Sequence, residues 1–373
     1  MRKRQLGAIY MGGFIGPFAG QSIAVILPNV ADTFSITLSQ AALTMAVYLF
    51  PFATVMLFSN RLVAGLRPKS VIMVAYTATI IGAITCLLTP SWWLFLAGFM
   101  IMGISNAFTT PVLQVMLRQI VPADRLGASL GTYAAMQSLG LFSSPLCAGL
   151  ATLLNWQYVY IIVLATAGWI VLVKVPEVPV MRNIGKEISG KVPVFPTVVH
   201  ALHCFVIGFA VIGTSVLVAQ HVGDHFGMGS VGRGIVVMCG GLASFILARS
   251  VGRVTDTWGP KHVLAVATIV AAVAVASVPL VPAVWLVGVL WALAIVSVQG
   301  MQLPINLTVL GAPGGNSLIA TVQAFRFYGG AVTPAVMLPV YANSSVAAFA
   351  VPAITLVIAL ALQATSPVWK GSR

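Results

Sequence analysis

The stretch GRVTDTWGPKHVL, residues 252–264, concentrates charge in a chain that otherwise carries very little. Arg253, Asp256 and Lys261 lie within nine positions of one another. Asp, Glu, Lys and Arg together make up 7% of the 373 residues, whereas a soluble domain holds about 25%. Charge in so apolar a chain belongs outside the lipid, so the stretch indicates a connection between two apolar segments.

The composition indicates a protein whose main solvent is lipid. Hydrophobic residues make up 59% of the chain, and the mean hydropathy is +1.03. The formal net charge of +13 comes from 19 basic and 6 acidic residues. The basic residues fall between apolar segments and form no stripe with interleaved aromatics, so we expect no nucleic-acid partner.

The length of the apolar runs predicts an all-α polytopic membrane protein. Only helices and closed barrels satisfy every backbone polar group in lipid. A spanning helix needs about 20 residues and a barrel strand about 10, and the runs here are too long for barrel strands. Twelve transmembrane helices are predicted, at residues 6–29, 38–58, 70–89, 92–114, 128–152, 157–174, 197–220, 230–250, 262–281, 283–308, 316–340 and 345–365.

Basic residues fall on every second connection between these spans, as they do in cytoplasmic loops. The outer loops hold Asp32 and Asp224 instead, with Arg233 as the nearest exception. We therefore predict a multi-pass protein of the inner plasma membrane with both termini cytoplasmic and an uncleaved first span. The inner basic residues are Arg2, Lys3, Arg4, Arg61, Arg67, Lys69, Arg118, Arg125, Lys174, Arg182, Lys186, Lys191, Arg249, Arg253, Lys261, Lys370 and Arg373.

The longest connection, residues 175–196, mixes charge, Pro and Gly. It predicts a cytoplasmic linker between two halves of six spans each. The N-terminal half is residues 1–174, and the C-terminal half is residues 197–373.

The two halves resemble each other in sequence. Gly140 and Pro145 of span five match Gly329 and Pro334 of span eleven at one constant offset. Many secondary transporters are built from such paired repeats, with the substrate site near the midplane between them.

The stretch at 252–264 also carries a family motif. Gly252, Asp256, Gly259 and Lys261 fill the pattern G-x-x-x-D-x-x-G-[RK]-[RK], with Pro260 in the first basic place. With twelve spans and a mid-chain linker, the whole chain resembles the major facilitator superfamily (MFS). The resemblance implies the MFS fold and secondary active transport by alternating access.

Three further segments are most like the drug:proton antiporter branch of that family. LPNVADTFSIT (27–37) resembles the end of span one, and GLFSSPLCAG (140–149) resembles G-x-x-x-G-P-x-x-G-G. LFLAGFMIMGISNA (94–107) resembles L-x-x-x-R-x-x-x-G, but Gly98 stands in place of the Arg. The resemblance implies efflux of lipophilic, drug-like molecules with protons as the coupling ion.

The same motif implies a conformational latch. In the family its aspartate holds one conformational state, so by repeat symmetry we expect Asp256 near the start of span five, at 125–129. Gly252 and Gly259 are expected to allow close turns, and Pro145 can kink span five. The first-half copy at 60–73 is degraded. It keeps Arg61, Arg67 and Lys69 but has no Asp.

Arg326 is the principal candidate for the substrate site. It lies ten or so residues into span eleven, hence about 15 Å deep. Charge inside a membrane is costly and usually functional. All six acids are assigned to loops or span ends, so the partner is a carbonyl, a Gln or Tyr side chain, a loop acid or an anionic substrate. Either Arg326 binds substrate, which makes a small organic anion the alternative cargo, or it is a snorkelling structural residue.

Other polar residues at mid-depth are candidates for substrate or proton binding. His203 in span seven either carries a coupling proton or is a neutral core residue. His221, Asp224 and His225 share one face, but no fourth ligand is visible and no metal is predicted. The neutral candidates are Gln21, Asn106, Gln137, Gln299, Gln302 and Gln323.

Nothing in the sequence predicts catalysis or a cofactor. The segment GAPGGNS (311–317) lacks the Lys of a P-loop, and neither a nucleophile elbow nor HExxH occurs. The four cysteines lie inside apolar runs without a CxxC pair. A membrane enzyme or a sensor would need clustered reactive groups or an added soluble domain. We therefore predict a transporter, not an enzyme, that works as a monomer in the bilayer.

Overall fold

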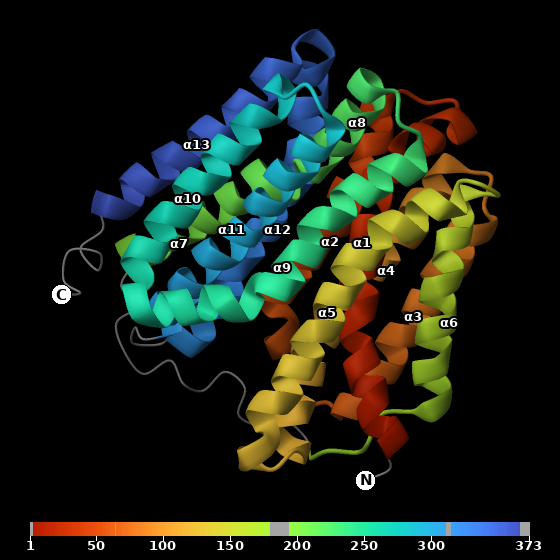
Figure 1. Ribbon diagram of the computed structural model, residues 1–373. Coiled ribbons are helices and arrows are strands. Elements are labelled where there is room, and N and C mark those ends of the chain that lie inside the picture. Colours follow the sequence, from red (N-terminus) through yellow and green to blue (C-terminus); the bar gives the residue numbers. More distant parts are fainter. Residues whose placement is uncertain (1–2, 64, 180–193, 311–314, 366–373) are drawn as a thin grey trace.

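The architecture is that of a helical bundle, seen in a computed structural model (Figure 1). The structure describes residues 3–63, 65–179, 194–310 and 315–365, with the backbone alone at 60–61, 123–128 and 315–317. All regular structure in these ranges is helical. Most of the predicted linker lies outside the described residues, as do the last eight residues of the chain.

The helices of the first half coincide with the first six predicted spans. The sixth begins with a 3-10 turn, η1, that runs directly into α6. They are α1 (Lys3–Phe34), α2 (Leu38–Leu62), α3 (Pro68–Leu88), α4 (Trp92–Ile120), α5 (Ala123–Ala151), η1 (Trp156–Tyr158) and α6 (Val159–Val173).

The helices of the second half coincide with the other six. Span seven is not one regular helix, because a π-helical segment, η2, separates α7 from α8. The elements are α7 (Val194–Ile207), η2 (Gly208–Ile212), α8 (Ser215–Phe226), α9 (Ser230–Trp258), α10 (Pro260–Ser277), η3 (Val278–Leu280), α11 (Val284–Leu310), α12 (Gly315–Asn343) and α13 (Ser345–Thr365). The prediction of an all-α polytopic protein with twelve spans is confirmed.

Among the described residues, ten of these spans are long and apolar enough to cross a membrane by length and composition alone. The other two are α5 and α12, which carry Gly, Ser, Thr and Gln between their apolar residues. These are the two spans that hold the matched Gly and Pro of the sequence repeat. Both helices pack against a helix of the opposite half, α5 on α9 and α12 on α2.

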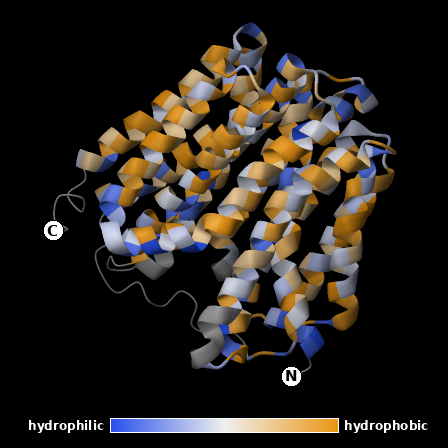
Figure 2. Ribbon diagram, in the orientation of Figure 1, coloured by the Kyte–Doolittle hydropathy of each residue, from blue (hydrophilic) through white to orange (hydrophobic). Residues whose placement is uncertain are grey.

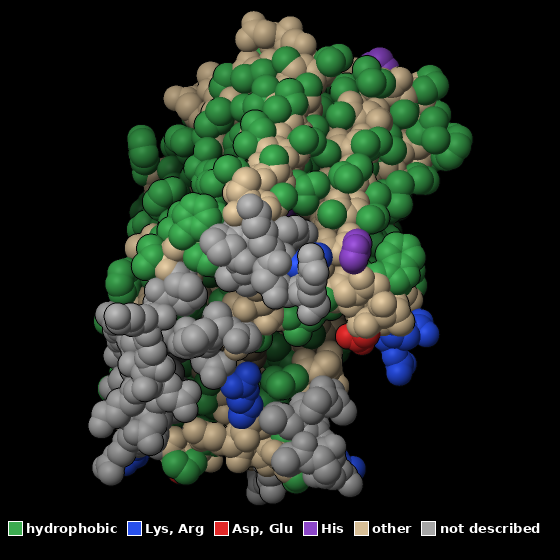
Figure 3. Space-filling view, turned by 90° about the vertical axis from the view of Figure 1, so that its left-hand side faces the viewer, with side chains coloured by type: hydrophobic (Ala, Val, Ile, Leu, Met, Phe, Trp, Pro, Cys, Tyr) green, Lys and Arg blue, Asp and Glu red, His purple; other side chains and the backbone are tan. Residues whose placement is uncertain are grey.

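The outer surface of the bundle is apolar along the spans. Large hydrophobic side chains such as Leu154 and Leu172 are more than four-fifths exposed. Figure 2 shows hydrophobic residues along most of each helix, and Figure 3 shows hydrophobic side chains covering the upper part of one face, with Lys and Arg near its lower end. Such a surface needs lipid around it.

Two helix pairs join the halves: α5 packs on α9, and α2 packs on α12. The end of the bundle that holds the N-terminus is called the proximal end. The opposite end, which holds the connection between α1 and α2, is called the distal end. There the α5–α9 contact is very close, because a Cβ on Gly149 would lie 2.5 Å from the carbonyl oxygen of Ser230, and one on Gly234 equally close to that of Pro145. Nearer the proximal end, Gly131 of α5 and Gly252 of α9 have no neighbouring atom within 4 Å of such a Cβ.

Span five also packs tightly on span one within the first half. Gly140 lies directly against the backbone of Phe14, and the Ser144 hydroxyl donates to the carbonyl oxygen of Phe18. Gly140 and Ser144 thus bring the α5 backbone close to α1, as small residues do in membrane helix pairs.

Candidate functional site

Arg326 lies near the middle of α12 and has no acidic partner among the described residues. Its Nε is buried and makes no hydrogen bond there, and its guanidinium carbon lies 4.6 Å from the ring centre of Phe327. The single ion pair in the described part of the chain joins Lys69 and Glu177 instead. A partly buried cation with an aromatic ring beside it and no acid among the described residues can take an anion as its partner.

The π-helical segment of span seven packs directly on the backbone of Arg326. Gly208, its first residue, has no room for a side chain because the carbonyl of Arg326 lies against its Cα. The Thr333 hydroxyl donates to the carbonyl oxygen of Phe209 at 2.8 Å, and Thr214 donates to that of Ala210 at 2.9 Å. Two carbonyls of the irregular turn thus accept side-chain hydrogen bonds, and one of these bonds comes from α12 itself.

Three of the predicted amides form a polar ladder between α11 and α12. Gln302 Nε2 donates to Gln323 Oε1 at 2.9 Å, and Gln323 Nε2 donates in turn to Asn306 Oδ1. Gln299 lies apart and donates to Ser244 of α9 at 3.3 Å. Since Gln323 is one turn before Arg326, the ladder fixes the face of α12 that carries the cation.

In the first half, Asn106 is part of the helix packing. Its side-chain oxygen accepts from Thr110 at 3.2 Å and lies against Gly16, whose carbonyl accepts from the Tyr48 hydroxyl at 3.0 Å. Gln21 and Gln137 are different, because both are half-buried and make no hydrogen bond to any described residue. Their amides have donors and acceptors to spare.

Aromatic residues that the sequence analysis did not single out join the two halves beside Arg326. The Tyr328 hydroxyl lies 2.8 Å from the Thr54 hydroxyl, and the Tyr328 ring lies 4.8 Å from that of Phe50. Phe327 makes an edge-to-face contact with Phe52 at 4.6 Å. The sequence AFRFYGG could have indicated these residues, because it places three aromatic residues next to one intramembrane Arg.

His203 is fully buried in α7, and neither of its ring nitrogens has a hydrogen-bond partner among the described residues. His200, one turn before it, is also buried, and its Nδ1 lies 2.9 Å from the Nε2 of Gln363 in α13. At the distal end, His221 stacks on His225 at 5.2 Å, and Asp224 is held by Gln220.

Comparison with known proteins decides the family. The sequence profile of the Major Facilitator Superfamily matches residues 9–334. The chain belongs to the major facilitator superfamily. It is therefore a multi-pass membrane transporter rather than an enzyme.

Individual relatives are distant. The MFS-type transporter YwfA of Bacillus subtilis is 25% identical over 295 residues, which cover 74% of this chain and 70% of YwfA. The lincomycin resistance protein LmrB of the same organism is 21% identical, over 52% of this chain and 40% of LmrB. The MFS-type transporter YhhS of Escherichia coli K12 is 27% identical, over 45% and 41%.

A solved structure has the same fold across nearly the whole chain. The crystal structure of the human organic anion transporter MFSD10 covers 97% of this chain and 99% of its own, with a TM-score of 0.72 and 14% identity. These similarities establish the MFS family and fold, whereas the drug:proton antiporter branch stays a prediction.

The MFS motif of the second half lies at the proximal junction of α9 and α10. Helix α9 continues through the predicted loop to Trp258, and Gly259, with φ of 81°, makes the sharp turn into α10. Gly252 makes no turn, since it lies within α9. Asp256 is exposed and forms no ion pair with a described side chain, while Arg253 donates to Ser250 at 3.3 Å. The side chains at 125–128, its predicted neighbours, lie outside the described residues.

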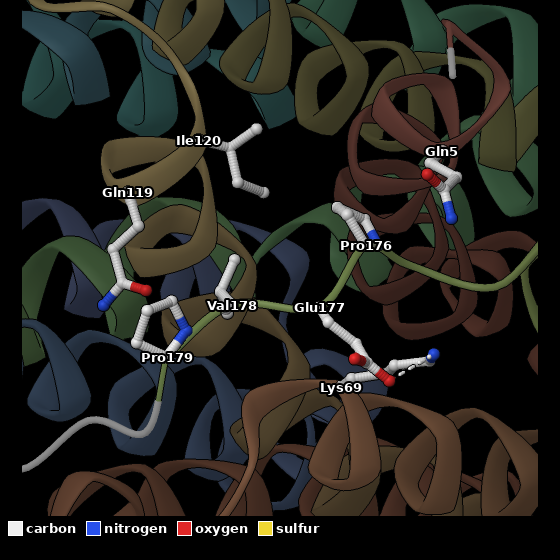
Figure 4. A pocket seen from close by; sticks show the side chains of 8 residues that line it. All are labelled: Gln5, Lys69, Gln119, Ile120, Pro176, Glu177, Val178 and Pro179. Carbon is white, nitrogen blue, oxygen red and sulfur yellow. Dashed lines mark hydrogen bonds and ion pairs between the residues drawn. The ribbon is translucent and has the colours of Figure 1, made fainter. Parts of the chain in front are cut away.

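In the first-half copy of the motif, which lacks its own Asp, a basic residue pairs with an acidic residue from another segment of the chain. Lys69, at the start of α3, donates to Glu177 Oε1 at 3.0 Å, in the segment that follows α6. This hydrogen bond, together with the charges of Lys69 and Arg67, holds the pKa of Glu177 below its ordinary value. The pair lines a proximal pocket of about 540 Å³ with Gln5 and Gln119 (Figure 4). None of the predicted substrate residues lines that pocket.

Proposed function

We propose that this MFS transporter carries a small organic anion, with Arg326 as the charge partner of the substrate. The proposal rests on a half-buried Arg in mid-span, whose Nε is buried without a hydrogen bond and which has no acid beside it among the described residues. A charge inside a membrane needs a counter-charge or a polar cavity, and an anionic substrate supplies the first.

The substrate would bind between the two halves near the middle of the bundle. Arg326 contributes from α12, while Gln21 of α1 and Gln137 of α5 contribute the amide groups that have no partner among the described residues. Phe50 and Tyr328 offer an aromatic wall for the body of the molecule. Together these groups suit an amphiphilic carboxylate better than a small inorganic anion.

Transport would proceed by rocking of residues 1–174 against residues 197–373 about this site. The close contact of α5 with α9 at the distal end, and the open surroundings of Gly131 and Gly252, support an arrangement here that opens toward the proximal side. With both termini cytoplasmic in the inner plasma membrane, that side is the cytoplasm, and one monomer suffices.

A second candidate is efflux of neutral lipophilic drugs, which would need no role for Arg326 in binding. The aromatic pairs between α2 and α12 support it, as does the name of the relative LmrB, which refers to lincomycin resistance. Proton coupling in this scheme would fall to His203, because no acid lies deep in a span. His203→Gln would then abolish the response of flux to a pH gradient.

The decisive experiment compares anionic and neutral substrates in proteoliposomes that contain Arg326→Gln. Loss of a charged hydrogen bond costs about 1.5–3 kcal/mol, so we expect KM to rise about 10- to 100-fold for aromatic carboxylates and little for neutral compounds. Arg249→Gln is the matched control, because it removes an exposed Arg of α9. Equal effects of Arg326→Gln on both classes would favour the drug-efflux function instead.

A further inference from the structure

Four buried polar atoms between α7 and α13 have no role in the proposed substrate site. They are Nε2 of His200, both ring nitrogens of His203 and Oε1 of Gln363, and none has a hydrogen-bond partner among the described residues. The three side chains are 4% exposed or less. Buried polar atoms are nearly always satisfied, so their concentration here indicates a ligand or ordered water.

We infer that His200, His203 and Gln363 form a hydrated proton-binding site that lies beside the substrate site and is coupled to it. The coupling depends on the proposed anion at Arg326. The three side chains are buried in the span region, and two of them are imidazoles, the group that gains and loses protons near neutral pH. No group of three or more His, Cys, Asp or Glu side chains suited to a metal occurs in the described ranges.

Gln363 can support either protonation state of His200. In the arrangement seen, Gln363 Nε2 donates to His200 Nδ1 at 2.9 Å, so the proton of the neutral ring is on Nε2. When the ring gains a second proton, Nδ1 becomes a donor. Rotation of the amide by half a turn then presents Oε1 as the acceptor, so one hydrogen bond is kept in both states.

The positions of these groups describe a path into the bundle. Gln363 lies near the proximal end of α13, and His200 lies near that of α7. His203 follows one turn deeper, and the backbone of Phe205, two residues further on, packs on Gly329 of α12, close in sequence to Arg326. A proton from the proximal side therefore reaches His203 before it reaches the substrate region.

The charges around His203 set the sign of the coupling. The elements packed on α7 are α11, α12, α13 and η2, and of these only α12 carries a charged residue in the described ranges, Arg326. The other titratable groups on α7 are His200 and Cys204. A proton on His203 adds a second positive charge within the packed helices α7 and α12, which is unfavourable until an anion neutralises the guanidinium of Arg326. Proton and anion therefore bind cooperatively and move in the same direction.

The test separates exchange from proton-driven accumulation, with benzoate as the probe anion. Protein-free liposomes under the same pH gradient give the passive entry of benzoic acid, which is subtracted. In proteoliposomes, His203→Gln and Gln363→Leu should retain benzoate counterflow at equal pH but lose accumulation driven by an acid exterior. His225→Gln, at the exposed distal histidine, is the control and should retain both. Retained counterflow also shows that the variants are folded.

Each outcome separates the two proposals. Arg326→Gln should lose both benzoate activities, and if it retains both, the proposed function is wrong. If His203→Gln keeps full proton-driven accumulation, the proton site is wrong and the anion carrier stands. If benzoate is not transported at all, nitrogen NMR of labelled histidines in the unliganded protein still decides. Rings of His200 and His203 that show no titration from acid to alkaline pH would overturn the inference.

Discussion

At the scale of single residues, glycine decides how closely span seven approaches span eleven. Gly208 of η2 lies against the carbonyl of Arg326, and Gly329 of α12 lies against that of Phe205. Each contact is to backbone, which cannot rotate away as a side chain can. Close backbone approach through small residues stabilises membrane helix pairs. The two glycines thus hold the irregular part of span seven on the segment that carries the cation.

Gly208→Ala should therefore destabilise the protein, whereas Gly168→Ala should not. Overpacking of a well-packed site costs about 1–3 kcal/mol, because α7 and α12 must separate. Gly168 in α6 has no neighbouring atom within 4 Å of the place that a Cβ would take, and Ala there gains up to about 1 kcal/mol of helix propensity. Thermal unfolding in detergent measures both. Equal melting temperatures for the two variants would contradict a tight crossing at Gly208.

Residue identity predicted which polar groups lie in the spans, but not how they pair. The depth of Arg326 in span eleven followed from counting residues, and the structure places it in mid-helix. The hydrogen bonds of Gln302 with Gln323, and of Asn106 with Thr110, depend on the rotation of one helix against another or on side-chain rotamers. Both are set by packing that a linear pattern does not contain. Aromatic contacts across the halves, such as Phe50 with Tyr328, were missed for the same reason.

At the scale of elements, the first-half loop shows how a degraded motif can keep an ion pair. Lys69 lies at the start of α3, and Glu177 lies in the segment after α6, so the pair joins two connections at one end of the bundle. Glu177 is about four-fifths exposed, and water therefore screens the interaction. The ion pair contributes little to stability, but the direction in which this contribution changes with pH can be predicted.

Glu177→Gln should lower the melting temperature slightly at neutral pH and not at all in acid. The folded-state pKa of Glu177 lies below its ordinary value, so the ion pair stabilises the protein above the ordinary Glu pKa of about 4.3. That stabilisation is lost as the pH falls through the folded pKa and the carboxylate gains a proton. Melting curves from neutral to acid pH measure the difference, and Lys69→Gln should show the same trend. A difference that grows in acid would contradict this assignment.

Hydropathy predicted the ends of a helix correctly where the helix ends at the edge of the lipid. Predicted and observed spans agree within a few residues for α3 and α13, whose ends are bounded by turn residues. Helix α9 extends eight residues beyond the predicted end at 250, through Arg253 and Asp256. Hydropathy marks the edge of the lipid, and a helix can continue into water. The π-helical turn at η2 left no trace in the sequence, because its residues are as apolar as their neighbours.

At the scale of the whole molecule, the backbones of the two halves are in direct contact at the distal end. Gly149 and Gly234 bring α5 and α9 into backbone contact there, while Gly131 and Gly252 on the same helices have open surroundings. The twelve spans and their repeat were predictable from the sequence, because hydropathy and spacing are local properties. Which ends of the halves touch was not, since the two MFS states have the same sequence and differ by a few kcal/mol at most.

Asp256→Asn should shift this balance further toward the proximally open arrangement. If Asp256 stabilises the closed proximal side by facing the positive N-terminus of α5, its charge contributes about 0.3–1 kcal/mol, roughly a two- to fivefold change in the ratio of states. Asp256 is exposed and forms no ion pair with a described side chain. Single cysteines at Gly131 and Ser230, in a background without the native cysteines, report the two ends by their rates of maleimide labelling. Asp256→Asn should speed labelling at 131 and slow it at 230.

The control for this variant is a second exposed acid, Asp32 on α1, which lies away from the α9–α10 junction. Asp32→Asn removes the same charge and should change neither labelling rate, so a shift in Asp256→Asn alone assigns the effect to the motif. Unchanged rates in Asp256→Asn would leave the charged stretch at 252–264 as a topology signal, because Arg253 and Lys261 alone suffice to hold that loop at the basic face.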